Sequence, residues 1–197
     1  MSDWLWIAGM IAVESVLQAE SREVRVIYST LERFDSRLAR LNRLARERGV
    51  PIEAQRPDAL APLVGSDSHG GVVAQVGPRV MQPLDALVAG DAPVVVMLDG
   101  VEDPFNFGQA VRSLYAAGID GLVVRPRNWL SVGTAVRASA GATEFMPTAE
   151  AESPEAAAEA LRTHSFRVAI GDEGVTVKAL IPQRGRLKSN LIPLFIV

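Results

Sequence analysis

Residues 98–112 read Leu98-Asp99-Gly100-Val101-Glu102-Asp103-Pro104-Phe105-Asn106-Phe107-Gly108-Gln109-Ala110-Val111-Arg112, and they join two apolar segments. The preceding residues 93–97 are uncharged and rich in valine, which is typical of a buried strand. Asp103-Pro104 ends that run, because proline disfavours a helical conformation in the residue before it. A helix capped by Asn106 is then expected, ending at Gly118 before a second buried strand at residues 121–125. This pattern predicts a strand–loop–helix–strand unit of a parallel sheet.

The helix in this unit has features of a ligand site. Gly108 and Arg112 are four residues apart, so they lie on the same side of the predicted helix. A glycine leaves open space that an arginine one turn later can reach, and the free N–H groups of a helix N-terminus favour an anion such as phosphate. Ligands of parallel sheets bind beyond the carboxyl ends of the strands, where this loop lies. Periodicity alone also fits an amphipathic crossover helix with one solvated arginine.

The order of residues 103–112, Asp-Pro-x-Asn-x-Gly-x-x-x-Arg, followed by Ala116-Ala117-Gly118, resembles the first motif of the SpoU (TrmH-type) ribose 2′-O-methyltransferases. These enzymes belong to the knotted SPOUT superfamily. The resemblance implies an α/β fold with a parallel-sheet methyltransferase domain at residues 93–197. It also implies transfer of a methyl group from S-adenosylmethionine to a ribose 2′-hydroxyl in structured RNA. Ribosomal RNA is favoured over transfer RNA, and the complete enzyme is expected to be a cytoplasmic homodimer.

The resemblance implies three catalytic residues. The family mechanism gives the position of Arg112 a general-base role. Arginine stays protonated in nearly every protein environment, so we expect Arg112 to steer a phosphate and to stabilise the developing alkoxide. Asn106 would orient Arg112 or the ribose. Residues 139–147 resemble the family segment Ser-Ala-Gly-Ala-x-Glu-x-x-Pro beside the active site, and its Glu144 would hold the arginine. A solvated loop glutamate is the alternative for Glu144.

The composition limits the ligands and structural bonds that can be expected in this chain. The chain has 197 residues, 48% of them hydrophobic, and a formal net charge of −3, so bulk charge does not attract nucleic acid and a local patch must bind it. No cysteine is present and there are only two histidines, so we expect neither disulfides nor a metal site, which suits a reducing cytoplasm. The apolar stretch at residues 4–16 contains Gly9 and Glu14 and predicts neither a signal peptide nor a membrane span.

Residues 1–77 predict a small α/β/α domain. Helices are expected at residues 4–17, 31–48 and 57–64, and strands at residues 24–28, 52–54 and 72–76. The Gly9-x-x-x-Val13 spacing, Gly49-Val50-Pro51 before a strand, and the His-x-Gly-Val-Val-Ala pattern of residues 69–74 resemble the N-terminal substrate-binding domain of the same family. That domain is similar in fold to small RNA-binding ribosomal proteins, so RNA is the expected partner.

Two features of this domain are candidate RNA contacts. The first is an arginine stripe opposite the apolar side of the 31–48 helix, formed by Arg33, Arg37, Arg40 and Arg43. Arginine grips phosphate in a bidentate way, but a solvated face neutralised by nearby acids explains the stripe equally well. The second is His69, which either contacts RNA or makes a structural hydrogen bond in its turn.

Residues 78–92 are expected to be a linker with a short helix at residues 84–88, and the catalytic domain begins at Pro93. A helix is expected at residues 129–138, a strand from Phe145, a helix at residues 154–161 and a strand at residues 166–170. The Gly-Asp-Glu-Gly tetrad after that strand only superficially matches the family's second motif, which holds the cofactor. Gly171 and Asp172 are therefore weak cofactor candidates, and residues 175–180 fit a variable insertion.

The last residues, 192–197, are apolar and resemble the strand that leads into the second motif. We therefore expect the chain to stop before the second and third motifs, which form the knot and most of the cofactor pocket. On that expectation the chain itself would be an inactive, RNA-binding part of such an enzyme and would not bind S-adenosylmethionine at micromolar concentration. An unrelated α/β enzyme acting on a phosphorylated small molecule is a further alternative.

Overall fold

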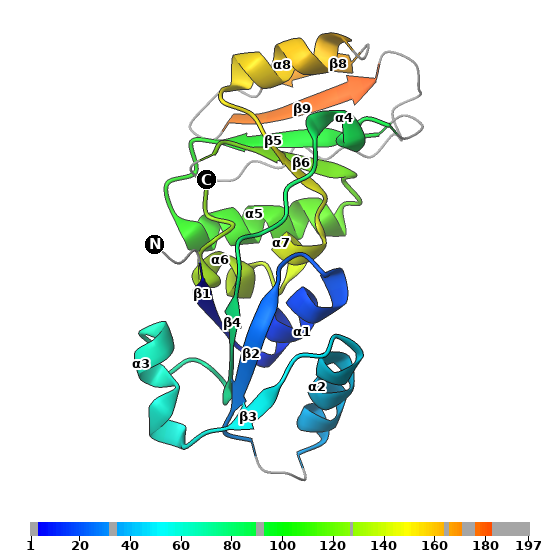
Figure 1. Cartoon of the computed structure of the whole chain (residues 1–197). Helices are drawn as coiled ribbons and strands as arrows, with labels where there is room; N and C mark the ends of the chain where they lie inside the picture. The colour runs from blue at the N-terminus through cyan, green and yellow to red at the C-terminus, as the bar shows by residue number, and fades with distance from the viewer. Residues whose placement is uncertain are drawn as a thin grey trace. The chain divides into compact units, whose positions relative to one another are not determined.

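The computed structural model describes residues 4–31, 35–89, 93–126, 128–163, 166–170 and 176–182 (Figure 1). The contacts between residues divide the chain into two compact units. Unit 1 consists of residues 1–80 together with residues 129–145. Unit 2 consists of residues 81–128 together with residues 146–197.

Unit 1 contains a four-stranded sheet with the order β1-β4-β2-β3. Its strands are β1 (Leu5–Ala8), β2 (Val24–Ser29), β3 (Ile52–Ala54) and β4 (Val72–Val76). β2 and β3 are parallel, and the other two pairs are antiparallel. The helices of residues 1–80 are α1 (Met10–Ala19), α2 (Ser36–Glu47), the 3-10 turn η1 (Pro57–Ala59) and α3 (Ala61–Val64).

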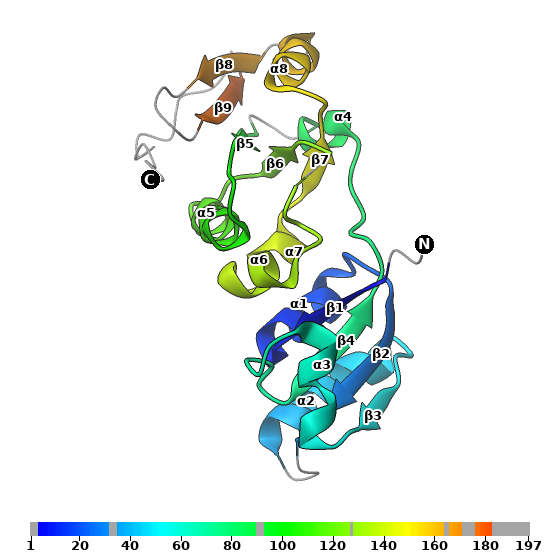
Figure 2. The same ribbon diagram turned by 90° about the vertical axis from the view of Figure 1, so that its left-hand side faces the viewer.

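The helices cover both faces of this sheet, as expected for an α/β/α domain. Residues of α1 and α2 pack with Ile7, Ile27 and Ala74 in one apolar core. Leu60 and the side chains of α3 pack with Ala8 and Val73 in a second cluster. Helix α3 lies on one side of the strands and α1 and α2 lie on the other (Figure 1, turned by 90° in Figure 2). The faces differ because neighbouring strand residues point to opposite sides of a sheet.

Two boundaries differ from the sequence prediction. Residues 4–17 were expected to be one helix, but residues 5–8 form strand β1 and the helix begins at Met10. Gly9 has a φ of 101° and donates its N–H to Val72 O at 2.9 Å, so it separates the two elements. Helix α2 begins at Ser36 instead of Leu31, because the Asp35 carboxylate caps it by accepting the Arg37 backbone N–H at 2.9 Å.

Unit 2 contains a five-stranded sheet with the order β7-β6-β5-β9-β8. The parallel strands β5 (Val95–Asp99), β6 (Gly121–Val124) and β7 (Thr148–Glu150) form the predicted parallel core. β9 (Thr176–Pro182) is antiparallel to both β5 and β8 (Phe166–Ile170), so the sheet is mixed. The expected variable insertion at residues 175–180 therefore forms most of a strand that pairs with the central strand β5.

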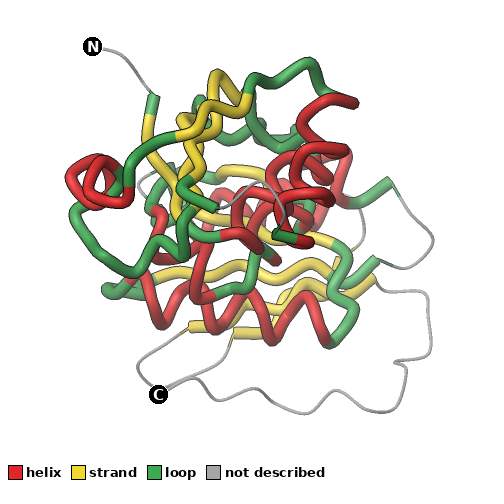
Figure 3. The backbone as a smooth tube through the Cα atoms, turned by 90° about the horizontal axis from the view of Figure 1, so that it is seen from below, coloured by secondary structure: helices red, strands yellow, loops and turns green. Residues whose placement is uncertain are grey.

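The helices of unit 2 are α4 (Leu84–Leu87), α5 (Pro104–Ala116) and α8 (Pro154–Thr163). Figure 3 colours the helices of the chain red and its strands yellow. Helix α5 begins earlier than predicted. Asp103, not Asn106, is the N-cap, and its carboxylate accepts the Asn106 backbone N–H at 2.8 Å. Pro104 occupies the first helical position, where its missing N–H costs nothing and its fixed φ suits the helix.

Residues 129–145 belong to unit 1, although they lie within the predicted catalytic domain in sequence. They form α6 (Gly133–Ala138) and α7 (Ala142–Phe145), which pack against β1 and α1. The helix predicted at residues 129–138 is thus shorter, and the strand predicted from Phe145 begins at Thr148. No helix in the described part of the chain has the length and apolar character needed to cross a membrane.

Candidate functional site

Helix α5 presents the motif residues at its exposed side. Phe107, Gly108 and Val111 are buried, whereas Asn106 and Arg112 are exposed. Gly108 lies on the buried side of the helix, and the open space expected above it stays a prediction. Among the described residues Arg112 has no ion pair, so its guanidinium is available to an anion at this surface.

The carboxyl ends of β5 and β6 carry a second pair of charged residues. Asp99 ends β5, and its Oδ1 lies 3.6 Å from Nη1 of Arg125, the residue after β6. Gly100 follows with a φ of 78°, which turns the chain away from the sheet. Arg125 is half-exposed, so solvent screens this ion pair strongly. The sequence analysis missed Arg125, although a charged residue just after a buried strand is a signal for the ligand edge.

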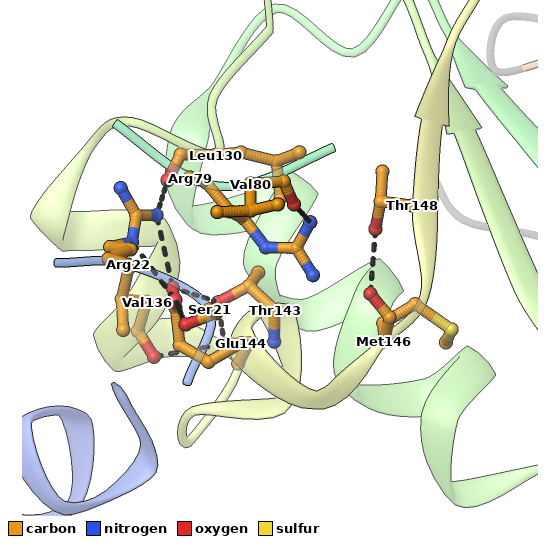
Figure 4. Close-up of polar contacts among 11 residues, drawn as sticks. Ser21, Arg22, Arg79, Val80, Leu130, Val136, Thr143, Glu144, Met146 and Thr148 are labelled. Carbon is orange, nitrogen blue, oxygen red and sulfur yellow. Dashed lines mark hydrogen bonds and ion pairs between the residues drawn. The ribbon is translucent and has the colours of Figure 1, made fainter. Parts of the chain in front are cut away.

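Glu144 lies in a buried polar cluster of unit 1 (Figure 4). Its Oε2 accepts hydrogen bonds from Ser21 Oγ at 2.5 Å and from Arg22 Nε at 2.9 Å, and its Oε1 accepts one from Arg22 Nη2 at 3.1 Å. The side chains of Arg22 and Glu144 are both 0% exposed. The Nη2 group of Arg22 also donates to the carbonyl oxygen of Leu130.

A second buried cation, Arg79, shares this environment. Burial lowers the pKa of the Arg79 guanidinium, the charge of Glu144 opposes that effect, and the charge of Arg22 adds to it. Two guanidinium groups and one carboxylate therefore share this environment, in which Arg79 Nη1 donates to Val80 O at 3.4 Å (Figure 4). The arginine that Glu144 binds within the described residues is Arg22. The expected contact between Glu144 and Arg112 stays a prediction that no described contact supports.

Some arginines of the α2 stripe form ion pairs, and others form none within the described residues. Arg37 is bound by the Asp35 carboxylate, and hydrogen bonds from the Arg37 side chain and backbone hold the pKa of Asp35 below its ordinary value. Arg40 Nε lies 3.1 Å from Glu14 Oε2. Arg43 and Arg46 are exposed, and neither has an ion pair within the described residues. Arg33 lies outside the described residues.

His69 makes the structural hydrogen bond that was one of its two expected roles. Its Nδ1 accepts the Gly71 backbone N–H at 3.1 Å, which holds the turn before β4. The other ring nitrogen is left for a further partner, so an RNA contact at His69 stays a prediction.

Gly171 and Asp172, the cofactor candidates, lie outside the described residues. The described residues contain no group of three or more histidine, aspartate or glutamate side chains that could hold a metal ion.

Comparison with protein families gives two matches. Residues 6–81 match the profile "RNA 2'-O ribose methyltransferase substrate binding". Residues 93–184 match that of the "SpoU rRNA Methylase family".

Curated proteins of known name are also similar. The 23S rRNA (guanosine-2'-O-)-methyltransferase RlmB of Acinetobacter baylyi is 30% identical over 168 residues, which are 83% of this chain and 68% of that protein. The protein of the same name from Shewanella oneidensis is 33% identical over 146 residues, 72% of this chain and 59% of that protein. The chain thus spans between 59% and 68% of the length of these two relatives.

Solved structures share the fold. The SpoU methyltransferase AviRb from Streptomyces viridochromogenes, in complex with AdoMet, has a TM-score of 0.66 and 23% identity, and the match covers 82% of this chain and 59% of that one. The AdoMet-bound rRNA methyltransferase from Sinorhizobium meliloti has a TM-score of 0.59 and 21% identity, and the match covers 75% of this chain and 54% of that one.

Proposed function

Because this chain belongs to the SpoU family of RNA methylases, we propose that it serves S-adenosylmethionine-dependent methylation of a ribose 2′-hydroxyl in ribosomal RNA. The observation that carries the proposal is the exposed side of α5, where Asn106 and Arg112 stand in the order of the family's first motif. The names of the relatives, which are 23S ribosomal RNA guanosine 2′-O-methyltransferases, support ribosomal RNA as the substrate.

The reaction is an in-line displacement at a methyl carbon. S-adenosylmethionine, when bound, supplies an activated methyl group. The ribose hydroxyl is a poor nucleophile, so it must lose its proton to water as its oxygen bonds to the methyl carbon and the sulfur–methyl bond breaks, which leaves S-adenosylhomocysteine. Arg112 would hold the neighbouring phosphate and stabilise the negative charge that grows on the ribose oxygen, and the Asn106 amide would orient that group. Gly171 and Asp172 lie outside the described residues, and no step is assigned to them.

Unit 1 would bind the RNA. It includes the residues that match the substrate-binding profile, and α2 supplies exposed cations at Arg43 and Arg46. Two exposed aromatic residues of α5, Phe105 and Tyr115, support self-association of unit 2, since apolar surface of this kind favours contact with a second copy. We therefore also propose that the protein forms a homodimer. We further propose that it acts in the cytoplasm and requires no metal ion.

A second function, RNA binding without turnover, is favoured by one observation. Residues 6–81 match a profile for RNA substrate binding, and that match is separate from the methylase match at residues 93–184.

Methyl incorporation tests the proposal. The chain is incubated with deproteinised 23S ribosomal RNA and radiolabelled S-adenosylmethionine, and modified sites are located by their resistance to alkaline cleavage. Calorimetric titration with S-adenosylmethionine and filter binding with the RNA are run alongside. Label at a ribose supports the methyltransferase, RNA binding without label or cofactor binding supports the second function, and absence of RNA binding contradicts both.

A further inference from the structure

One ion pair connects residues that are far apart in sequence. Arg22 follows helix α1, Glu144 lies in α7, and 122 positions separate them. Both side chains are fully buried, and the arginine contacts the carboxylate through Nε and Nη2, a forked geometry that restricts orientation as well as distance. The Arg22 contact with Leu130 O fixes the beginning of the same segment.

Further contacts hold residues 129–145 on the N-terminal strands and helices. Gly141 has a φ of 83° and lies so close to α1 that a Cβ at this position would be 1.9 Å from Ser15 Oγ. Arg137 Nη1 donates to Ser68 O at 3.1 Å, which ties α6 to the turn before β4. The small residues of this segment therefore serve close packing against α1.

The buried pair is not an obvious source of stability. Removing two charges from water is costly, and their attraction roughly compensates that cost. Among the described residues, Arg22 Nη1 is also buried without a hydrogen-bond partner, which is unfavourable. The pair instead restricts the segment to a single orientation. An apolar contact would allow the two surfaces to slide past each other, whereas a forked ion pair does not.

The chain leaves this segment by two short connections. Four residues lie between the end of β6 at Val124 and Trp129, and two lie between Phe145 and the start of β7 at Thr148. With the third crossing between Val80 and Met81, the two units are covalently joined at three places. If residues 129–145 detached from unit 1, two of these three connections would be lost, and only the one between Val80 and Met81 would join the units.

We propose that Arg22 is a positioning residue for methyl transfer. By holding Glu144, Arg22 keeps residues 129–145 as part of the RNA-binding unit. RNA bound to that unit then restricts the motion of β7 through the two-residue connection after Phe145. This inference rests on the proposed function, and it adds that the segment couples RNA binding to the sheet that carries the catalytic helix. A short connection keeps the segments that it joins at a nearly fixed separation, whereas a long flexible connection lets that separation vary.

Amide hydrogen exchange with and without deproteinised 23S ribosomal RNA tests the coupling in the full chain. In the wild type, RNA should slow exchange at residues 142–145 and 148–150 by about tenfold, in addition to its effect on α2. In Arg22→Gln, RNA should still slow exchange in α2 but leave residues 148–150 unchanged. The variant keeps the buried Arg79, whose guanidinium is still influenced by the charge of Glu144.

Arg48→Gln is the matched control. Arg48 donates to Leu17 O at 3.0 Å and pairs with Glu20, so its loss weakens unit 1 without touching residues 129–145. It should leave the RNA effect on residues 148–150 intact. Arg22→Lys keeps the charge but loses the fork, and should restore that effect only in part. Should Arg22→Gln fail to fold, Arg137→Gln, at an exposed residue of the same segment, should reduce the effect.

The outcomes separate the two proposals. RNA binding that leaves residues 148–150 unaffected in the wild type, or equally affected in the wild type and in Arg22→Gln, overturns the coupling and leaves the proposed function standing. No RNA binding by the wild type overturns the proposed function, and the coupling with it. Where turnover is measurable, Arg22→Gln should lower kcat with little change in the KM for RNA. Titrating the active sites corrects for unfolded protein, so a simple loss of folded protein would not lower the kcat measured in this way.

Discussion

Arg112 is the residue on which the proposed chemistry depends. It is exposed on α5 and has no ion pair within the described part of the chain, so its guanidinium is free to meet the substrate. Arg112→Lys keeps a positive charge but loses the planar fork that holds phosphate in a bidentate way. We expect kcat to fall by about 100-fold or more, as for loss of a transition-state donor, with near-normal cofactor affinity.

Steady-state methylation kinetics with a calorimetric cofactor titration measure this. Arg162→Lys, at an exposed arginine of α8 in the same unit, is the control and should retain activity. Wild-type turnover in Arg112→Lys would remove this residue from the catalytic assignment.

Gly141 shows why a glycine is required at one contact. An alanine there would take up a strained positive φ and place its Cβ 1.9 Å from Ser15 Oγ. Gly141→Ala should therefore destabilise unit 1 by at least the roughly 1–3 kcal/mol that overpacking costs. Denaturant unfolding followed by tryptophan fluorescence measures this, because Trp4, Trp6 and Trp129 all lie in unit 1.

Gly65→Ala is the control that measures backbone strain without the steric clash expected for Gly141→Ala. Gly65 has a φ of 66°, and apart from its chain neighbours no atom of the described residues lies within 4 Å of where a Cβ would be. Its replacement therefore costs only the left-handed conformation, about 1–2 kcal/mol. Equal losses in the two variants would show that the contact between Gly141 and Ser15 contributes nothing.

At the scale of elements, the arginines of α2 differ in their partners. Arg43 and Arg46 have no ion pair within the described residues, whereas Arg37 and Arg40 are held by Asp35 and Glu14. Arg43→Gln with Arg46→Gln should weaken binding to all RNAs alike and flatten the slope of log affinity against log salt by about 1.5, because each phosphate contact contributes about 0.7–0.9. Filter binding over a salt series measures this.

Arg37→Gln with Arg40→Gln is the comparison for that experiment. Each loses a surface ion pair of small energetic value, and we expect a smaller change in the salt slope. A larger effect of this pair would mean that RNA displaces the acidic partners.

The start of α5 depends on Asp103. Its carboxylate accepts the Asn106 N–H at 2.8 Å, so Asp103→Ala leaves that donor without its cap and should weaken the helix by about 1 kcal/mol. Asp103→Asn retains an oxygen acceptor and should be close to wild type. Hydrogen exchange of the first-turn amides of α5 distinguishes the two, and equal exchange in Asp103→Ala and wild type would argue against the cap.

At the scale of the whole molecule, unit 1 is assembled from two separate stretches of sequence. A chain that ends at Met81, close to the limit of the substrate-binding profile, would lack residues 129–145. Arg22 would then be a cation without Glu144, and the surface of α1 that packs on α7 would be exposed. We expect this chain to unfold at a clearly lower denaturant concentration than unit 1 of the full chain, as monitored by the fluorescence of Trp4 and Trp6.

Adding a peptide of residues 129–145 should raise the stability of that shorter chain, and the gain should grow with the logarithm of the peptide concentration above its Kd. A shorter chain as stable as unit 1 in the full protein would show that residues 129–145 are not needed for its fold.

Local chemistry predicted much of this architecture. Valine-rich runs before and after Asp103-Pro104 predicted β5 and β6, and the apolar spacing predicted the buried side of α5. The α/β/α arrangement of residues 1–80 also followed from alternating strands and helices. These features were predictable because they depend on neighbours within one or two turns of the chain.

Other features depended on partners far away in sequence. The stretch Leu5–Ala8 could extend α1, but pairing with β4 made it a strand, since backbone hydrogen bonds to a distant segment outweigh a weak local preference. The same holds for β9, whose antiparallel pairing with β5 has no local signal.

The sequence by itself determined the motif of α5 and the family to which those residues point. Only the tertiary structure decided what Glu144 binds. Its sequence context matches a catalytic segment, yet its carboxylate is buried against Ser21 and Arg22, more than 120 positions away. A residue's motif specifies its neighbours along the chain, but the partner of a buried charge is whichever opposite charge the fold brings within hydrogen-bonding distance.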